Sequence, residues 1–397
     1  MSSSNEVQIS YIEEIVYAET PAAGDFSQFR FTSDGLNAAP ETVESAQIRT
    51  DRLSSGQVLT GLTIGGDLPV EFAKSQDIDD LLEASMFDTW ASTAAVVADL
   101  TVDTTASEIT RAAGDWNADV KVGDTIILSS MDDAVNDETV MVTSITSALI
   151  IKFVGPNTMI DGTGAGASFQ KGDELSIGVT SGRRSFSVEK QFKDLADKAT
   201  IYKGMYLDGF NLSAAYGEIV SGAFNFVGAD YLTAEQASEL ITDGRTILPA
   251  GTSTSLNGSI DMAFLATSAG NSFSGVDFCI QSVELTLANN NQAQNCVGKI
   301  GPDNYSAGTA SVEVSLSVYL SDEAWQFMDK KLSQEDFSIG FILKNSAGWY
   351  SFYLPAVQVS FDDPSSGGQN TDIILDMSGV SKVGDSGEKS LYVYKSL

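Results

Sequence analysis

Residues 311–321 read "SVEVSLSVYLS" and alternate between apolar and polar side chains without a break. A period of two over this length is typical of a β-strand whose two faces meet different surroundings. The apolar face consists of Val312, Val314, Leu316, Val318 and Leu320. The other face is small, hydroxylated and acidic, and consists of Ser311, Glu313, Ser315, Ser317, Tyr319 and Ser321. The pattern predicts that the apolar face packs into a core. It leaves open whether the polar face meets bulk water, a partner chain or an enclosed space.

The same alternation recurs along the chain, in "SFSVEKQF" (185–192), "SVELTL" (282–287) and "VQVSF" (357–361). Helical signals are few. One is "SQDIDDLLEASMF" (75–87), with Ser75 as N-cap and an apolar stripe of Ile78, Leu81, Leu82 and Met86. The other is "SDEAWQFMDKKL" (321–332), with Ser321 as N-cap. The chain is therefore predicted to be mainly β (α+β).

The two expected helices each follow a similar alternating strand, in 67–82 and in 315–328. Matching strand segments then follow, in 185–212 and in 336–361. This similarity between the two parts of the chain predicts a diverged internal repeat of two β-sandwich units, each with a flanking helix.

One segment, 93–182, has no counterpart in the second copy, and its short strands with polar turns predict a small inserted β-barrel or sandwich. The first unit then comprises 1–92 with 183–245, and the second comprises 246–397. Without the insertion the two units are closely similar in length, and loop insertions are thermodynamically mild.

The composition excludes several functions. The formal net charge of −32 is opposite to that of most nucleic-acid binders, although an excess of carboxylates also has a simpler role in solubility. There is no His, which removes His-dependent triads and His metal ligands. Cys279 and Cys296 have no metal spacing and are expected to be free, partly buried thiols. The N-terminus has neither a basic region nor an apolar run of a signal peptide, and no apolar run is long enough to span a bilayer.

Motifs for catalysis are weak. "SVEK" (187–190) has the SxxK spacing of some serine acyl transferases, but a strand sends Ser187 and Lys190 to opposite faces. "GTGAGA" (162–167) lacks the Lys and the helix of a phosphate loop and is expected to be a flexible turn. "MDDAVNDE" (131–138) lacks the spacing of an EF-hand and is expected to be a hairpin tip. We predict no catalytic, cofactor or metal site, and expect no enzyme.

Three segments resemble the major tail tube proteins of long, non-contractile (siphovirus-type) phage tails. They are "SAQIRTDRLSSGQVLTGLTIGGDLPVEF" (45–72) with the helix after it, 185–230 from "SFSVEKQFKD" to "GAFNFVGAD", and 289–325 from "NNNQAQNCVGKIG" to "SDEAW". The similarity covers most of the chain outside 93–182. Its motifs are strands, turns and helix caps, and carry no catalytic residues.

This resemblance implies a structural subunit of the virion. In the family, sandwiches assemble into rings whose inner sheets join edge to edge into one β-barrel, the rings stack into a tube, and DNA passes through the lumen at ejection. It implies as partners further copies of the chain, a tape-measure protein, tail terminator and tail-tip proteins, with assembly in the host cytoplasm. Two units per chain would give trimeric, pseudo-sixfold rings. Hexameric rings are the alternative.

Within that expectation, Glu313, Ser315, Ser317 and Glu284 are the candidate lumen-facing residues. An acidic wall would repel phosphate and deny it cationic contacts. An outward-facing polar strand would have the same pattern, so both orientations stay open. A phage decoration or receptor-binding module is the alternative function, and a carbohydrate-active enzyme is a further one.

Overall fold

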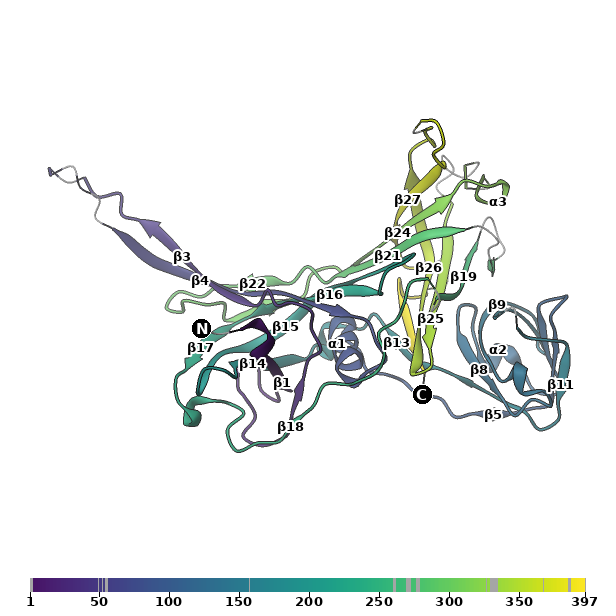
Figure 1. The fold of residues 1–397 in the computed structure, drawn as a ribbon, viewed down its shortest axis with the longest axis horizontal. Coiled ribbons are helices and arrows are strands. Elements are labelled where there is room, and N and C mark those ends of the chain that lie inside the picture. Colours follow the sequence, from purple (N-terminus) through teal and green to yellow (C-terminus); the bar gives the residue numbers. More distant parts are fainter. Residues whose placement is uncertain are drawn as a thin grey trace.

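The fold is mainly β, as the sequence predicts (Figure 1). The computed structural model describes residues 3–48, 50–51, 53, 56–156, 158–259, 262–268, 273–275, 279–325, 327–328, 335–366, 368–384 and 387–396. Its strands form one hydrogen-bonded network of 18 strands, a separate eight-stranded sheet and a two-stranded sheet. The few helices are short, so the core is built from sheet faces.

We divide the main network into an N-terminal and a C-terminal half. The N-terminal half comprises η1 (Ser4–Glu6), β1 (Val7–Glu13), β2 (Phe26–Gln28), β3 (Asn37–Glu44), β4 (Gln57–Glu71), α1 (Gln76–Met86), β14 (Ser185–Phe192), β15 (Lys198–Ala215), β16 (Ser221–Gly228), β17 (Asp230–Ala234), η4 (Ala237–Glu239) and β18 (Ile247–Leu248). The C-terminal half comprises β19 (Met262–Ser268), β20 (Phe273–Gly275), β21 (Ile280–Ala288), β22 (Gln292–Gln294), β23 (Asn304–Ser306), β24 (Ser311–Tyr319), α3 (Asp322–Trp325), β25 (Phe337–Asn345), β26 (Gly348–Phe361), β27 (Ile374–Ser381) and β28 (Tyr392–Lys395).

Between α1 and β14 lies a third group of elements. It comprises β5 (Val96–Val97), β6 (Leu100–Asp103), β7 (Glu108–Arg111), α2 (Trp116–Asp119), β8 (Thr125–Ser129), η2 (Ala134–Asn136), β9 (Thr139–Ser147), β10 (Ile150–Val154), β11 (Gly162–Gly164), β12 (Ser168–Lys171), β13 (Asp173–Ser176) and η3 (Thr180–Gly182). Strands β5–β12 make up the eight-stranded sheet, which has its own core around the fully buried Trp116. Strand β13 instead pairs with β28 of the main network.

The strand that contains the opening stretch is β24. Val312, Val314, Leu316 and Val318 are buried, Glu313 is exposed, and the Ser side chains between them are half-buried. The alternation is therefore confirmed for Ser311–Tyr319, whereas Leu320 follows the end of the strand and is only half-buried. The buried side chains join a single core cluster that contains residues from both halves.

The two halves have the same order of strand pairing. In the N-terminal half the antiparallel order is β1–β14–β15–β16–β4–β3. In the C-terminal half it is β19–β25–β26–β27–β24–β21. The order along the chain also agrees, since β1, β2, β3, β4, α1, β14, β15 and β16 correspond in turn to β19, β20, β21, β24, α3, β25, β26 and β27.

Strands β15 and β21 join the two halves. They pair antiparallel from Gly209↔Ala288 to Ala215↔Ser282. Gly209 has φ +144°, and a Cβ there would lie 1.9 Å from the carbonyl oxygen of Leu287. A residue without a side chain is therefore required where the two strands meet.

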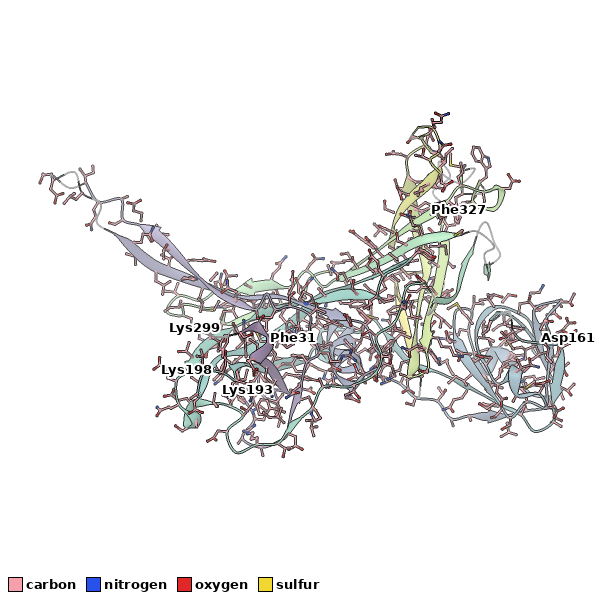
Figure 2. The ribbon with its side chains drawn as sticks, in the orientation of Figure 1. Phe31, Asp161, Lys193, Lys198, Lys299 and Phe327 are labelled. Atoms are coloured by element: carbon pink, nitrogen blue, oxygen red, sulfur yellow. The ribbon has the colours of Figure 1, made fainter. Side chains whose placement is uncertain are left out.

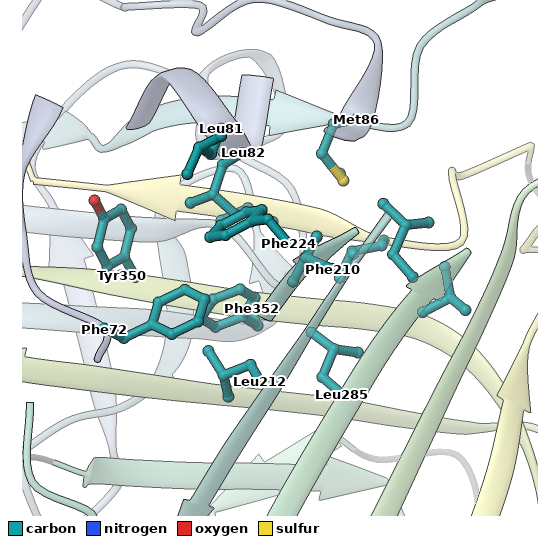
Figure 3. Close-up of a cluster of buried hydrophobic side chains, with 14 of the residues drawn as sticks. Phe72, Leu81, Leu82, Met86, Phe210, Leu212, Phe224, Leu285, Tyr350 and Phe352 are labelled. Carbon is teal, nitrogen blue, oxygen red and sulfur yellow. The ribbon is translucent and has the colours of Figure 1, made fainter. Parts of the chain in front are cut away.

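Helix α1 packs on the apolar face of the N-terminal sheet. Ser75 is in the N-cap position, but its hydroxyl makes no capping hydrogen bond, because it faces the carbonyl of Ala73 (3.4 Å) instead. The predicted apolar stripe is buried, and Leu81, Leu82 and Met86 lie with Phe210 and Phe224 in one cluster (Figure 3). Tyr350 and Phe352 of β26 belong to the same cluster, so α1 contributes to the contact between the halves.

The second helix begins where the sequence predicts it. Ser321 accepts a hydrogen bond at its Oγ from the backbone N–H of Ala324 (3.2 Å), and α3 follows from Asp322 to Trp325. The rest of the predicted helix, up to residue 332, lies largely outside the described residues.

The inserted sheet packs against the C-terminal half. Met141 of β9 is buried with Ile342, Trp349, Tyr353 and Tyr394. The Tyr394 hydroxyl donates to Asp124 Oδ1 (2.7 Å), and the Thr125 hydroxyl donates to Ser351 Oγ (2.8 Å). The segment that carries this sheet is connected to the N-terminal half, between α1 and β14, but it packs against the C-terminal half.

Candidate functional site

One surface of the main sheet is polar over seven adjacent strands. We call it the polar face and define it by side chains that the strand registers place on one side. They are Asp67, Pro69 and Glu71 of β4, Ser221, Ala223 and Asn225 of β16, Asn211, Ser213 and Ala215 of β15, Ser282, Glu284 and Thr286 of β21, Glu313, Ser315 and Ser317 of β24, Asp376, Ser378 and Val380 of β27, and Gln358 and Ser360 of β26.

A single cross-strand row shows how regular this surface is. Directly paired residues in antiparallel strands share a face, so a row can be followed from strand to strand. The row runs through Glu71, Ser221, Ser213, Glu284, Ser315, Ser378 and Ser360. It crosses the β15–β21 junction without a change in chemistry. The polar face is therefore one surface built by both halves.

The polar face carries negative charge and hydroxyl groups. Its charged side chains are the carboxylates Asp67, Glu71, Glu284, Glu313 and Asp376, and none of the defined residues is Lys or Arg. The Ser317 hydroxyl donates to Asp376 Oδ1 (2.6 Å), and the Ser255 hydroxyl donates to Glu71 Oε2 (2.6 Å). Such a surface has acceptors and negative charge but no cation to hold a phosphate group.

The opposite side of the same strands is apolar. Val283, Leu285 and Leu287 of β21 are buried, as are the alternate residues of β24. Helix α1 covers this side and lies below the sheet in Figure 1. The labelled Lys193 and Lys198 also lie below the sheet in Figure 2. The polar face therefore lies on the upper side, where β24, β26 and β27 rise from the right end of the sheet.

A shallow depression on this surface holds about 380 Å³ and is lined mostly by Ser282, Glu284, Ser315, Ser317, Ser360, Asp376 and Ser378. Ligand pockets are mostly apolar with a few polar groups. This depression has the reverse composition, so it has the character of a wall and not of a ligand pocket.

The four residues predicted from sequence lie together on the polar face. Glu284 is paired with Ser315, while Glu313 and Ser317 are on the same strand as Ser315. Strands β4, β26 and β27 also contribute to this face, through residues that include Asp67, Glu71 and Asp376 and that were not among those predicted from the sequence. A signal was present, because Asp376 and Ser378 alternate with the buried Leu375 and Met377.

The weak catalytic motifs have structural roles. The Ser187 hydroxyl donates to Glu14 Oε1 (2.7 Å) in a buried site, and Lys190 forms an ion pair with Asp34. "SVEK" is thus part of strand β14, as expected, although Ser187 and Glu189 are buried because Glu14 and Thr242 cover that face. In "GTGAGA", Gly162–Gly164 form β11 and only the remainder is a turn. In "MDDAVNDE", Asp137 accepts from the Met131 N–H and Asp132 from the Thr163 hydroxyl.

The described residues offer little for metal binding, membrane insertion or disulfide formation. Within the described residues, no group of three or more His, Cys, Asp or Glu side chains is placed to hold a metal ion. No described helix combines the length and apolar character needed to cross a bilayer. Cys279 and Cys296 are free, as predicted, but both are exposed and not partly buried, because neither lies on the apolar side of a strand.

Comparison with known proteins agrees with the shape of this site. A family model described as phage tail tube protein matches residues 4–380, which is nearly the whole chain. The comparison with curated proteins gives no match. The family match indicates a structural role in a phage tail. The chain belongs to the phage tail tube protein family.

Proposed function

We propose that copies of this chain assemble into stacked rings, and that the polar face lines the lumen through which DNA passes during ejection. The observation that carries the proposal is the polar face itself. Its five carboxylates and its hydroxyl groups extend over seven strands with no cationic side chain among the residues that define it. A DNA duplex would find no cationic contact there and would be repelled.

The shape of the sheet supports an inner position for the polar face. The two halves meet at an angle that opens on the side of the polar face, while α1 lies on the other side (Figure 1). The insertion also lies away from the opening, against the outer aromatic side chains Trp349 and Tyr394. If the polar face were on the outside of a ring, the angle between the two halves would have to open on the side of α1.

The repeated strand order supports two tube units per chain, with residues 1–92 and 183–245 as the first and 246–397 as the second. Three chains would then complete a pseudo-sixfold ring. Six chains per ring is the alternative, and it would require the two halves to have different roles. The resemblance to siphovirus-type tubes further suggests tape-measure, tail terminator and tail-tip proteins as partners, and assembly in the host cytoplasm.

The hairpin of β3 and β4 suggests how rings stack. It projects far from the body of the molecule (Figure 1). Its exposed apolar side chains are Val43, Ile48, Leu53, Val58 and Leu59. Exposed apolar groups gathered on one projection mark an interaction surface, and a neighbouring ring is the partner that a tube supplies.

Size-selective labelling tests the proposal. In a background with Cys279 and Cys296 replaced by Ser, Ser315→Cys places a thiol on the polar face and Glu19→Cys places one on an exposed loop. In tubes seen by negative-stain microscopy, a bulky polymer-linked maleimide should label residue 19 and not residue 315, while both should react in the unassembled chain. Equal labelling of both in intact tubes would refute an inner polar face, and the absence of any tubes would refute self-assembly.

A further inference from the structure

A pocket lies where the inserted sheet meets the C-terminal half, and the proposed tube function makes no use of it. It holds about 500 Å³. One wall comes from residues between Asn117 and Asp124 of the insertion and from Ile145, and the other from residues in or beside β25, β26 and β28. The insertion approaches β25 at this place in Figure 1. Ligand pockets commonly hold about 300–1,000 Å³, so this pocket has a suitable size.

Three tyrosine rings belong to the wall from the C-terminal half. The ring centroids of Tyr353 and Tyr392 are 6.3 Å apart, and those of Tyr392 and Tyr394 are 6.5 Å apart with the rings nearly parallel. Tyr353 and Tyr394 are buried, and a Cβ at Gly123 of the insertion would lie 2.2 Å from the Tyr353 ring. Tyr392 is half-buried, and its hydroxyl accepts from the backbone N–H of Lys389 (3.0 Å). Tyr392 is therefore the ring available to a ligand, and it is already held in place.

Asp336 adds a hydrogen-bond acceptor to the same wall. Its Oδ2 atom forms an ion pair with Lys382 Nζ (2.8 Å). Its Oδ1 atom is buried, and no described residue donates a hydrogen bond to it. A buried acceptor without a donor is costly to the fold. Because Asp336 lines the pocket, a hydroxyl group of a bound ligand would supply the missing donor.

The charges of the pocket are close to balance. Asp124 lies 3.5 Å from Lys171, which it shares with Glu174 outside the lining, and it accepts from the Tyr394 hydroxyl and from the Lys121 N–H. The charged residues that line the pocket or pair with its carboxylates are Asp124, Asp336, Glu388, Lys121, Lys171 and Lys382. A site with carboxylates and lysines in equal number favours a neutral ligand over an ionic one.

We propose that this pocket binds a neutral pyranose sugar unit. A pyranose ring has a face of C–H groups, which packs on an aromatic ring, and an edge of hydroxyl groups, which donate to carboxylates. Tyr392 is the ring against the C–H face, and Asp336 Oδ1 accepts from one hydroxyl. A mostly apolar wall with a few placed polar groups is the usual design of a binding pocket. Binding requires only the folded chain, so the inference is independent of assembly and of the direction in which the polar face points.

Sugar binding is measured on the full chain by saturation-transfer NMR with the methyl pyranosides of glucose, galactose, mannose and N-acetylglucosamine. We expect at least one of them to bind. Tyr392→Ala should abolish the signal, whereas Tyr392→Phe keeps the ring and should retain it. Asp336→Asn should weaken binding about tenfold, because an acceptor with a full charge becomes a neutral amide. The matched control is Tyr216→Ala, which changes an exposed tyrosine outside the pocket and should bind like the wild type.

Three results would overturn the proposal. One is the absence of binding by any of these glycosides at millimolar concentration. Another is binding that persists in Tyr392→Ala, which would place the sugar elsewhere. The third is binding of tetramethylammonium instead of the glycosides, with the same dependence on Tyr392, because an aromatic ring also attracts organic cations.

A second measurement covers the case in which Tyr392→Ala does not fold. The wild-type chain is labelled with a photoreactive glycoside and digested, and the labelled peptides are identified by mass spectrometry. Labelling of the two walls of the pocket would support the proposal, and labelling confined to other peptides would overturn it. Competition by a polysaccharide of the host envelope that exceeds that of the methyl glycosides would identify a surface glycan as the source of the sugar, and weaker competition would identify a free sugar.

Discussion

Reversing the charge of the polar face should slow the passage of DNA. The variant Glu284→Lys/Glu313→Lys changes two exposed side chains on adjacent strands. Exposed substitutions away from special features usually alter stability by less than about 0.5 kcal/mol, so folding should be preserved. Each substitution changes the local charge by two units, so the net charge of the polar face rises by four units in each chain.

The magnitude follows from Coulomb's law. Two unit charges about 4 Å apart interact by about 1 kcal/mol in bulk water. Replacing repulsion by attraction at that distance is therefore a change of about 2 kcal/mol for each site in contact with a phosphate, before screening. The Debye length is about 8 Å at physiological ionic strength and about 3 Å at about 1 M salt. Slow release should be strongest at low salt and should disappear at high salt.

The assay is the rate of DNA release from purified phage particles that carry the variant, followed with an intercalating dye over a range of salt concentrations. The matched control is Glu19→Lys/Glu235→Lys, which makes the same change in net charge at exposed residues away from the polar face. Glu235 lies 3.9 Å from Lys198, below the sheet in Figure 2. Equal release from the two variants at low salt would refute the reasoning.

Three further predictions concern stability. Tyr394→Phe removes the hydroxyl that donates to the buried Asp124 and should lower the free energy of unfolding by about 1–3 kcal/mol in chemical denaturation. The control Tyr216→Phe changes an exposed side chain and should alter it by less than about 0.5 kcal/mol. Equal losses would mean that the Tyr394–Asp124 contact is unimportant. Deleting 96–171 should expose Trp349 and Tyr353, and the burial of each side chain contributes about 1.5–3 kcal/mol of stability that would be lost. The exposed aromatic surface should increase the binding of a hydrophobic dye and self-association. A deletion variant as soluble as the wild type would contradict this. Burial raises the pKa of Asp80 and of Asp124, because the folded protein disfavours their ionised forms. Protonation of these carboxyl groups therefore stabilises the fold, and this stability is lost as the pH rises through the raised pKa. Mild acid should therefore raise the denaturant concentration at the midpoint of unfolding. The rise should be smaller in the variant Asp124→Asn, which cannot ionise at this position.

Local patterns in the sequence predicted the faces of the strands well. The alternation in 311–321 placed four apolar side chains in the core, and Ser321 and the stripe of α1 were also predicted correctly. These features depend on neighbours along the chain, and a period of two or 3.6 reports them directly. The same alternation placed Glu313, Ser315, Ser317 and Glu284 on one side of the sheet, and that this side faces a lumen stays a prediction.

Contacts between distant segments could not be predicted in this way. Nothing in "LYVYKSL" indicates that the Tyr394 hydroxyl reaches Asp124, or that β28 pairs with β13. The burial of Ser187 and Glu189 on the supposedly open side of β14 depends on Glu14 and Thr242, which come from remote loops. Period-based reasoning identifies which side chains share a face, but not what covers that face.

The acidity of the chain serves more than the polar face. The chain has 54 Asp and Glu residues, and the polar face accounts for only Asp67, Glu71, Glu284, Glu313 and Asp376. Most of the negative charge therefore has another role, and an excess of Asp and Glu keeps a protein soluble. Exposed ends of strands carry part of it, since Glu41 and Glu44 of β3 and Asp362 and Asp363 after β26 are all exposed. Charged side chains on strand edges discourage unwanted pairing between free chains, as is common in soluble β proteins.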